Sequence, residues 1–419
     1  MKRKLKIILL FVIPSLGGVW GGHCFAQINY AKQMATTIMN QYKDSMVVKK
    51  YASHLEQDKL PVGNRPANWN YEIGVVLMGF ERLAKHTGDN TYMNYTKHIV
   101  DHFIKDDGTI RTYMMEEYNS DMIPPGRQLL RLHEIYKEDK YKIAAQALRN
   151  QISWQPRNQA GGFWHKLKYP SQMWLDGLYM VEPFYAEYSV INNQPQYFND
   201  IINQFVWMEK YSRDAKTGLL YHGWDESRLQ KWANKKTGLS PEFWSRSMGW
   251  YMMALVDVLD FIPANHPRRN ELIKILNRTT TALIKFQDAK SGVWWQVTNK
   301  ANQDKNYLES SGTAMFVFSI AKAIRMKYLP ATFNAALQKA YNGMIKEFVK
   351  EDANASPDDS VGRGQYHYMQ AVAGAGLGGI PYRDGTYEYY VNEPRRDDDL
   401  KAIGPFIQAC IEMELLKKK

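Results

Sequence analysis

The sequence contains little cysteine and no cluster of basic residues. Its 419 residues include only two cysteines, Cys24 and Cys410, so a disulfide framework is excluded. The formal net charge is +11, but the basic residues are scattered along the chain, which argues against a nucleic-acid-binding surface. Hydrophobic residues make up 45% of the chain, a share that excludes a disordered protein. Aromatic residues, in contrast, are abundant: 12 Trp and 27 Tyr side chains can fill a core and line a site for sugar rings.

Motifs typical of several other enzyme classes are missing. No Gly-x-Ser-x-Gly elbow and no P-loop occurs. Residues 374–379 match the dinucleotide-binding fingerprint, but no strand pattern precedes them, so we do not predict a nucleotide site there. His98 and His102 have zinc-ligand spacing on a helix, but no further ligands accompany them. The sequence therefore predicts neither a metal nor another cofactor.

The first 26 residues have the features of a secretory signal peptide. A basic segment at residues 2–6 precedes an apolar run, Ile7–Val19, which is too short and too interrupted for a membrane span. Cys24 and Ala26 provide the small residues that signal peptidase requires. We expect cleavage after Ala26 and export to the periplasm without a membrane anchor. A lipoprotein attached through Cys24 is the alternative, although His23 fits that motif poorly.

Cleavage at this position changes two properties of the chain. The leader carries four basic and no acidic residues, so its removal lowers the formal charge from +11 to +7. Only Cys410 would remain, so the mature chain would have no intramolecular disulfide. We expect residues 27–419 to form one catalytic domain that is stabilised by a large apolar core. The oligomeric state is not indicated by the sequence.

Helical periodicity dominates the remainder of the chain. Apolar residues recur at spacings of three and four, strand signals are sparse, and no linker rich in Pro, Gly or Ser divides the chain. The pattern predicts an all-α protein with helices near residues 28–42, 70–87, 90–106, 121–137, 139–153, 173–190, 195–211, 244–261, 267–288, 309–328, 333–349 and 397–415.

A weak internal repeat groups these helices into pairs. Gly108, Gly162, Gly218 and Gly292 each begin a short aromatic segment between predicted helices. Each repeat therefore has the length of a helical hairpin with an aromatic loop at one end. Six hairpins closed into a ring would bury the terminal repeats, whereas an open solenoid would need special caps. We predict a single (α/α)6 barrel with the aromatic loops gathered at one mouth.

Asp176 is the first candidate for catalysis. It lies near the start of a predicted helix, between Trp174 and Tyr179. An aspartate at this place can simply interact with the positive end of the helix dipole. Aromatic neighbours disfavour the charged carboxylate, however, and this favours the role of a general acid.

Asp121 is a second candidate, one hairpin earlier. Paired acids from adjacent hairpins suit general acid and base catalysis. The segment Asn119–Gly126 is rich in turn-forming residues, so a helix N-cap is an equally good interpretation of Asp121. Farther along the chain, Glu309–Thr313 is predicted to begin a helix that is capped by its serines.

Two later segments, Tyr221–Ser227 and Phe243–Trp250, add polar and aromatic groups. The planar donors of Arg246 can bind a substrate carboxylate with two hydrogen bonds. The alternative is an arginine that packs on Trp244 or Trp250 and pairs with Glu242.

Seven motifs follow one another along the chain: Trp69–Gly74, the Asp121 loop, Phe163–Lys166, Met173–Leu178, His222–Glu226, Trp244–Arg246 and Gly379–Tyr389. In this order they resemble glycoside hydrolase family 105, the unsaturated rhamnogalacturonyl hydrolases. The unsaturated glucuronyl hydrolases of family 88 are related to that family. The resemblance spans essentially the whole mature chain, and it too implies an (α/α)6 barrel.

The resemblance also implies a reaction. The substrate would be a polysaccharide-lyase product with a 4,5-unsaturated uronic acid at its non-reducing end. Asp176 would protonate C4 of the vinyl ether and then activate the water that adds at C5, with Asp121 assisting. No metal, cofactor or covalent intermediate is implied. By the same motif matching, the residues expected to bind substrate are Tyr71, His165, Lys166, Trp174, His222, Trp244, Arg246 and Trp250.

Two other functions are compatible with the residues alone. An inverting glycosidase on the same barrel would use Asp121 and Asp176 as separate acid and base on saturated chains. A carbohydrate-binding protein without turnover would need only the aromatic loops. A sugar epimerase fits less well because the ordered motifs do not resemble that group. The sequence leaves open whether the uronate derives from galacturonate or glucuronate, and which sugar follows it.

Overall fold

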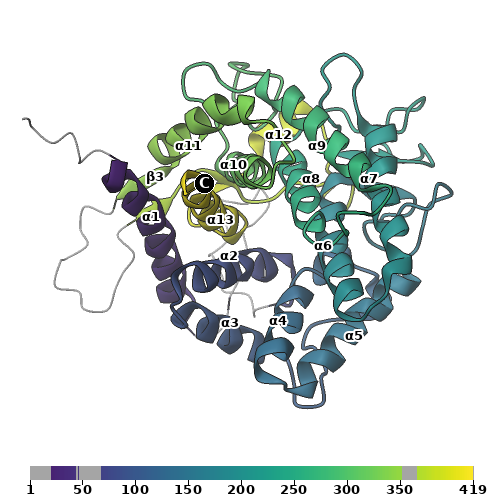
Figure 1. The fold of residues 1–419 in the computed structure, drawn as a ribbon. Helices are drawn as coiled ribbons and strands as arrows, with labels where there is room; N and C mark the ends of the chain where they lie inside the picture. The colour runs from purple at the N-terminus through teal and green to yellow at the C-terminus, as the bar shows by residue number, and fades with distance from the viewer. Residues whose placement is uncertain (1–19, 44–45, 47–67, 352–365, 419) are drawn as a thin grey trace, which may run out of the picture.

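The computed structural model describes residues 20–43, 46, 68–351 and 366–418. Figure 1 shows its helices arranged in a ring. The α-helices are α1 (Trp20–Gln41), α2 (Tyr71–Thr87), α3 (Thr91–Asp101), α4 (Gly126–Tyr136), α5 (Asp139–Trp154), α6 (Leu175–Ile191), α7 (Phe198–Ser212), α8 (Ser245–Val258), α9 (Arg269–Ile284), α10 (Ser310–Arg325), α11 (Asn334–Phe348), α12 (Tyr387–Asn392) and α13 (Leu400–Lys417). The 3-10 helices are η1 (Met115–Glu117), η2 (Ser120–Met122), η3 (Pro195–Tyr197) and η4 (Ala331–Phe333).

Three small antiparallel sheets of two strands each lie in the connections. They pair β1 (Gln172–Trp174) with β2 (Gly223–Asp225), β3 (Val349–Glu351) with β4 (Tyr366–Tyr368), and β5 (Ala371–Val372) with β6 (Arg395–Arg396). Within the described part of the chain, no helix is long and apolar enough to cross a membrane.

The helices form two concentric layers (Figure 1). The inner layer consists of α2, α4, α6, α8, α10 and α13, and each contacts its neighbours around the ring. The outer layer consists of α1, α3, α5, α7, α9 and α11. Every residue of α8 is buried, whereas the outer helices bury one face, as their period of 3.6 residues allows. The predicted (α/α)6 barrel is therefore confirmed.

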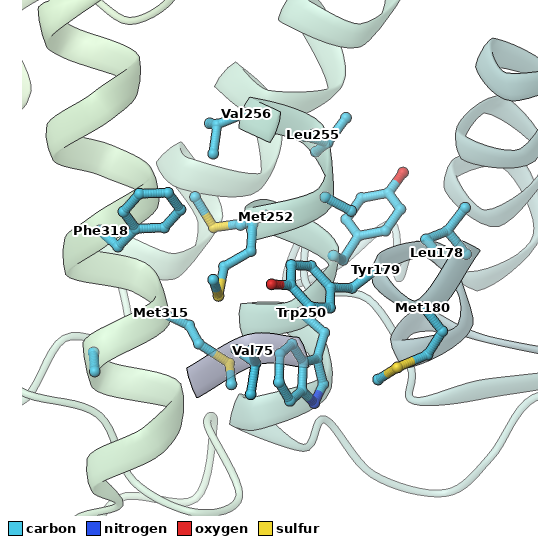
Figure 2. Packing of buried hydrophobic residues seen from close by; sticks show 14 of the residues in the cluster. Val75, Leu178, Tyr179, Met180, Trp250, Met252, Leu255, Val256, Met315 and Phe318 are labelled. Carbon is cyan, nitrogen blue, oxygen red and sulfur yellow. The ribbon is translucent and has the colours of Figure 1, made fainter. Parts of the chain in front are cut away.

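The core fills the space inside the inner helices and the interface between the inner and outer layers. Trp250, Met252, Leu255 and Val256 of α8 project toward side chains from neighbouring inner helices (Figure 2). The Trp250 ring packs against Tyr179 at a centroid distance of 4.7 Å. Burial of so many large apolar side chains stabilises a chain whose described part contains no disulfide.

An ionic network joins the C-terminal ends of α2, α8 and α10 to Arg127 in the first turn of α4. Its centre is Asp257 of α8, which is fully buried. Its Oδ1 accepts from Arg82 Nη2 and Lys322 Nζ, each at 2.7 Å, and its Oδ2 accepts from Arg127 Nη1 at 2.8 Å. Cations at this end also counter the negative ends of the helix dipoles. The network thus ties four inner helices together at the mouth opposite the predicted aromatic loops.

The opposite end of the ring carries the hairpin turns. Three of the glycines expected in the turns have a left-handed backbone conformation: φ is 82° at Gly108, 76° at Gly218 and 81° at Gly292. In the second hairpin Gly161, with φ of 100°, takes this role instead of Gly162. Each turn leads from an outer helix to the N-terminus of the next inner helix. The aromatic loops therefore gather where the inner helices begin.

The structure corrects two helix starts. The fourth predicted helix begins at Gly126 rather than near residue 121, because Pro124 and Pro125 precede it and leave Asp121 in η2. The serines do not cap α10; Glu309 is its N-cap, and its carboxylate accepts from the backbone N–H groups of Ser311 and Gly312. The short helix α12 was not predicted. The leader expected over residues 1–26 falls largely outside the described residues and stays a prediction.

Candidate active site

A two-stranded sheet positions the first catalytic candidate. Strands β1 and β2 pair antiparallel, with Trp174 opposite Gly223. This register places Asp176, which follows β1, beside His222, which precedes β2. The Leu175 N–H donates to the His222 carbonyl at 3.0 Å and fixes the two segments together. Asp176 Oδ2 consequently lies 3.0 Å from His222 Nε2.

The surroundings of Asp176 are those of a partly dehydrated acid. Its side chain is 11% exposed, and it is the second residue of α6. Within the described ranges, no lysine or arginine lies within ion-pair distance of its carboxyl group. Neither Asp176 Oδ2 nor His222 Nε2 makes a well-directed hydrogen bond to another described residue. The Asp176 carboxyl group therefore lies close to a histidine but forms no ion pair with a described lysine or arginine.

Asp121 has a different environment. Its carboxylate contacts Lys166 Nζ, and its Oδ1 lies 3.5 Å from His165 Nε2. Burial is the largest influence on Asp121 and acts to raise its pKa, but the charge and hydrogen bond of Lys166, together with His165 and Lys168, outweigh burial and hold the pKa below its usual range. Asp121 is not a helix N-cap; Asn119 is, and its side chain accepts from the Asp121 N–H. The two acids thus differ, since only Asp121 has an ammonium partner.

His165 is a neutral member of the same group. It is 4% exposed, and burial lowers its pKa to about 4. Its Nδ1 lies 3.1 Å from the Ser120 hydroxyl, and its ring stacks on Trp174 at 4.5 Å. A neutral imidazole at this position offers hydrogen bonds without adding charge beside Asp121.

Aromatic rings continue from His165 around the site. Tyr169 stacks on Trp174 at 4.8 Å, and Trp174 meets His222 edge-on at 5.4 Å. His222 lies 4.8 Å from Trp244 on its other side. These rings come from two connections, α5–α6 and α7–α8, and form one continuous wall, which is suited to the apolar faces of a sugar.

Arg246 is the second residue of α8 and is 1% exposed. Its guanidinium lies 5.1 Å from the Trp244 ring, and Nη1 donates to the Val372 carbonyl at 2.6 Å. Its Nε has no hydrogen-bond partner among the described residues. The proposed partner Glu242 pairs with Lys300 instead, so that part of the structural alternative is wrong. Arg246 is therefore a buried cation without a paired carboxylate in the described part of the chain.

Two predicted residues lie deeper in the ring. Tyr71, the first residue of α2, packs edge-on against Trp250 at 6.0 Å. Trp250 is 1% exposed and belongs to the core, where it contacts Tyr179. Burial, together with Glu72 and Asp121, raises the pKa of Tyr71 well above its ordinary value. Tyr71 therefore keeps its proton near neutral pH and can donate a hydrogen bond.

Two contributors to the site, Tyr390 and Arg383, were not predicted from the sequence. Tyr390 of α12 places its hydroxyl 2.6 Å from His222 Nδ1, and the last motif that we recognised ends one residue before it. Arg383, inside that motif, donates to the Tyr169 hydroxyl at 2.7 Å and lies 6.0 Å from the Trp174 ring. Over the residues described, no group of three or more His, Cys, Asp or Glu side chains has a metal-binding arrangement.

Comparisons with known proteins agree with this architecture. A glycoside hydrolase of family 105 from C. acetobutylicum ATCC 824 is 40% identical, with a TM-score of 0.82 over 92% of this chain and 99% of its own. The unsaturated rhamnogalacturonyl hydrolase of Bacillus subtilis (strain 168) is 26% identical over 64% of this chain and 75% of its own length. The 24.9 kDa protein in the picA locus of Rhizobium radiobacter is 35% identical over 56% of this chain and 99% of its own length.

A family model covers nearly the whole chain as well. The model for glycosyl hydrolase family 88 matches residues 30–417. These residues include all twelve ring helices, completely or in large part, and every candidate site residue. The chain therefore belongs to glycosyl hydrolase family 88, and its similarity over nearly its full length to a family 105 enzyme places it with the family 105 glycoside hydrolases.

Proposed function

We propose that this enzyme removes a 4,5-unsaturated uronic acid from the non-reducing end of polysaccharide-lyase products. The substrates that we favour are unsaturated galacturonyl- or glucuronyl-rhamnose oligosaccharides, in keeping with the rhamnogalacturonyl hydrolase named among its relatives. The observation that carries the proposal is the pair of unlike acids. Asp121 is bound to Lys166, whereas Asp176 has only His222 within ion-pair distance among the described residues.

Asp176 acts first as a general acid. Its proton is transferred to C4, the C4=C5 π electrons form the new C–H bond, and the cation that results is shared between C5 and the ring oxygen. Water then adds at C5 while the Asp176 carboxylate takes a proton from it. The hemiketal opens to a 4-deoxy-5-keto uronate and releases the rest of the oligosaccharide. One carboxyl group can serve both steps because it is returned to its starting protonation state.

Asp121 supplies fixed negative charge near the reacting ring. Because the pKa of Asp121 lies below its ordinary range, this group stays ionised over the working pH range and cannot replace Asp176 as the acid. Its oxygens can accept hydrogen bonds from sugar hydroxyls and interact favourably with the cation that develops at C5.

The uronate carboxylate is assigned to Arg246. A buried guanidinium without a carboxylate partner is costly unless a ligand supplies the opposite charge. The N-terminus of α8 adds positive potential at the same place, because Arg246 is the second residue of that helix. An anionic sugar would satisfy both features.

The test uses defined disaccharides from lyase digestion. The ultraviolet absorbance of the C4=C5 bond should disappear with the wild-type chain and persist with Asp176→Asn. Asp139→Asn is the matched control, since Asp139 is an exposed aspartate in the first turn of α5. In D2O, the product should carry deuterium at C4, because that carbon receives its proton from an exchangeable acid.

Three results would contradict the proposal. Full activity of Asp176→Asn would remove the acid role. Release of sugar from saturated oligosaccharides, with no preference for lyase products, would support an inverting glycosidase instead. Tight binding of an unsaturated disaccharide with no product by mass spectrometry would support a binding protein.

We further propose that the chain is exported to the periplasm and cleaved after Ala26. The support is the basic and apolar pattern of residues 1–19 together with the small residues at Cys24 and Ala26. Fractionation of expressing cells followed by N-terminal sequencing should find a periplasmic protein that begins at Gln27. A cytoplasmic protein that retains Met1 or Lys2 would contradict this proposal.

A further inference from the structure

Two side chains from different parts of the chain, His222 and Tyr390, follow one another from the proposed acid Asp176. The Tyr390 hydroxyl lies 2.6 Å from His222 Nδ1, and His222 Nε2 on the far side of the same ring lies 3.0 Å from Asp176 Oδ2. Tyr390 and His222 are both fully buried. Gln296 Nε2 donates to the Tyr390 carbonyl at 3.1 Å and helps to hold α12 in place.

The direction of the Tyr390–His222 hydrogen bond follows from the partners available. Within the described residues, the Tyr390 hydroxyl has no hydrogen-bond partner except His222 Nδ1. If the hydroxyl accepted a proton from Nδ1–H, its own hydrogen would be buried without an acceptor, which is unfavourable. The Tyr390 O–H therefore donates, and His222 Nδ1 accepts.

The charged groups around the pair do not offer another acceptor. The neighbours that affect Tyr390 most are Tyr389, Asp176, Glu242 and Arg383. Glu242 is bound to Lys300, and the Tyr389 hydroxyl accepts from the Gly376 N–H. Burial raises the pKa of Tyr390 well above its ordinary value, so the phenol keeps the proton that it donates.

This direction determines the tautomer of His222. A neutral imidazole that accepts at Nδ1 carries its hydrogen at Nε2, and this nitrogen lies 3.0 Å from Asp176 Oδ2. A proton on Oδ2 would then lie against the Nε2 hydrogen across only 3.0 Å, so the transferable proton of Asp176 resides on Oδ1. In the opposite tautomer, the Nε2 lone pair would face Asp176 and would accept its acidic proton, which would withdraw that proton from the substrate.

We propose that Tyr390 is a positioning residue that holds His222 as the Nε2–H tautomer and thereby directs the proton of Asp176 toward the substrate. The inference rests on the proposed function of Asp176 as the acid. Tyr390 itself does not contact the reacting atoms, so its effect is transmitted through His222.

The kinetic test compares two tyrosine variants. Tyr390→Phe removes only the hydroxyl, and Tyr251→Phe is the matched control, because the Tyr251 hydroxyl is also buried and makes one hydrogen bond, to the Phe205 carbonyl at 3.0 Å. We expect Tyr390→Phe to lower kcat by roughly 10- to 100-fold, with little change in KM, and to alter the pH profile of kcat. Tyr251→Phe should leave all three unchanged. Unchanged kcat and pH profile in Tyr390→Phe would overturn the proposal.

A spectroscopic test is independent of substrate. In protein labelled with 15N-histidine, the His222 signals, assigned by their loss in His222→Gln, should show Nε2 protonated and Nδ1 unprotonated in the wild type. Tyr390→Phe should shift His222 toward the other tautomer. An Nδ1–H tautomer in the wild type would overturn the proposal even if Tyr390→Phe failed to fold. If the enzyme proved inactive on unsaturated sugars while the Nε2–H tautomer was observed, the proposed function would fail and the positioning of His222 by Tyr390 would stand.

Discussion

His222 Nε2 lies 3.0 Å from Asp176 Oδ2, although the two residues are far apart in the sequence and belong to successive hairpins. The pairing of β1 with β2 produces this contact, because the strand ends that carry the two residues lie side by side. A sheet of only six residues thus creates the central relationship of the site. Lys166 and the buried Arg246 come, like this pair, from the α5–α6 and α7–α8 connections and the helix starts that follow them, and Asp121 comes from an earlier connection, between α3 and α4.

Replacing Lys166 by methionine should shift the acidic limb of the pH profile upward. Without the ammonium, burial raises the pKa of Asp121, so this group is protonated at a higher pH. The variant should therefore lose activity at mildly acidic pH, where the wild type keeps its activity. The measurement is kcat/KM against pH. Lys168→Met is the control, since Lys168 is exposed and affects Asp121 less; equal shifts in both variants would argue against the specific pair.

Arg246→Lys should weaken binding of the uronate while retaining the charge. A lysine cannot present two parallel donors, and the loss of a charge-assisted hydrogen bond costs about 1.5–3 kcal/mol, or roughly 10- to 100-fold in KM. The control uses the substrate as its methyl ester, which lacks the carboxylate. The wild type should bind the ester poorly, and Arg246→Lys should weaken ester binding little further. An equal effect on acid and ester would remove the assignment of Arg246 to the carboxylate.

Asp257→Asn should destabilise the fold without a direct effect on chemistry. The substitution leaves Arg82, Arg127 and Lys322 without their shared carboxylate, and loss of one partner from a buried ion pair costs about 3–5 kcal/mol. The measurement is the free energy of unfolding in urea. Asp260→Asn is the control, because Asp260 contacts Lys322 but is 33% exposed, and it should cost about 1 kcal/mol or less.

The pH dependence of the stability of Asp257→Asn provides a second test of the network. The cations around Asp257 overcome its burial and hold its pKa below the ordinary value. Its stabilising contribution is therefore complete above the unfolded pKa of about 3.9 and is lost as the pH falls below that value. The stability of Asp257→Asn should fall less steeply than that of the wild type in this range. Parallel curves would contradict the role of Asp257.

His165→Gln should flatten the pH dependence of stability between about pH 6.5 and 4. His165 has a folded pKa of about 4, against about 6.5 when unfolded, so the unfolded chain binds more protons in this window. Wild-type stability should therefore decrease as the pH falls through it, by up to about 3 kcal/mol from this residue. The comparison is urea unfolding at several pH values. His98→Gln, at an exposed position, should follow the wild type; a His165→Gln curve equally steep would contradict the assignment.

The sequence by itself determined the twelve helices of the ring and their pairing into hairpins. Apolar spacing of three and four residues can be satisfied only by helices with one buried face, and repeated glycine turns pair these helices into hairpins. The end at which the aromatic loops meet follows from that alternation, whereas closure of the ring, in place of an open solenoid, is decided by the packing of α13 against α2. Ordered motifs also selected the residues that the structure brings together, among them Asp176, His165, Trp174 and His222.

Only the tertiary structure decided the chemistry around each acid. Asp121 and Asp176 occupy similar places in the sequence, each near the start of a predicted helix. In the structure Asp121 contacts Lys166 and Asp176 lies beside His222. These contacts depend on which loops pair and not on the residues next to each aspartate in the sequence. The pairing of Glu242 with Lys300, and not with Arg246, likewise reflects which loops meet. The role of Tyr390 could not be predicted from the sequence, because no sequence pattern distinguishes a buried tyrosine in a short helix from an ordinary core residue. Its role follows from the distance to His222 and from the absence of another acceptor among the described residues, both of which exist only in the folded chain.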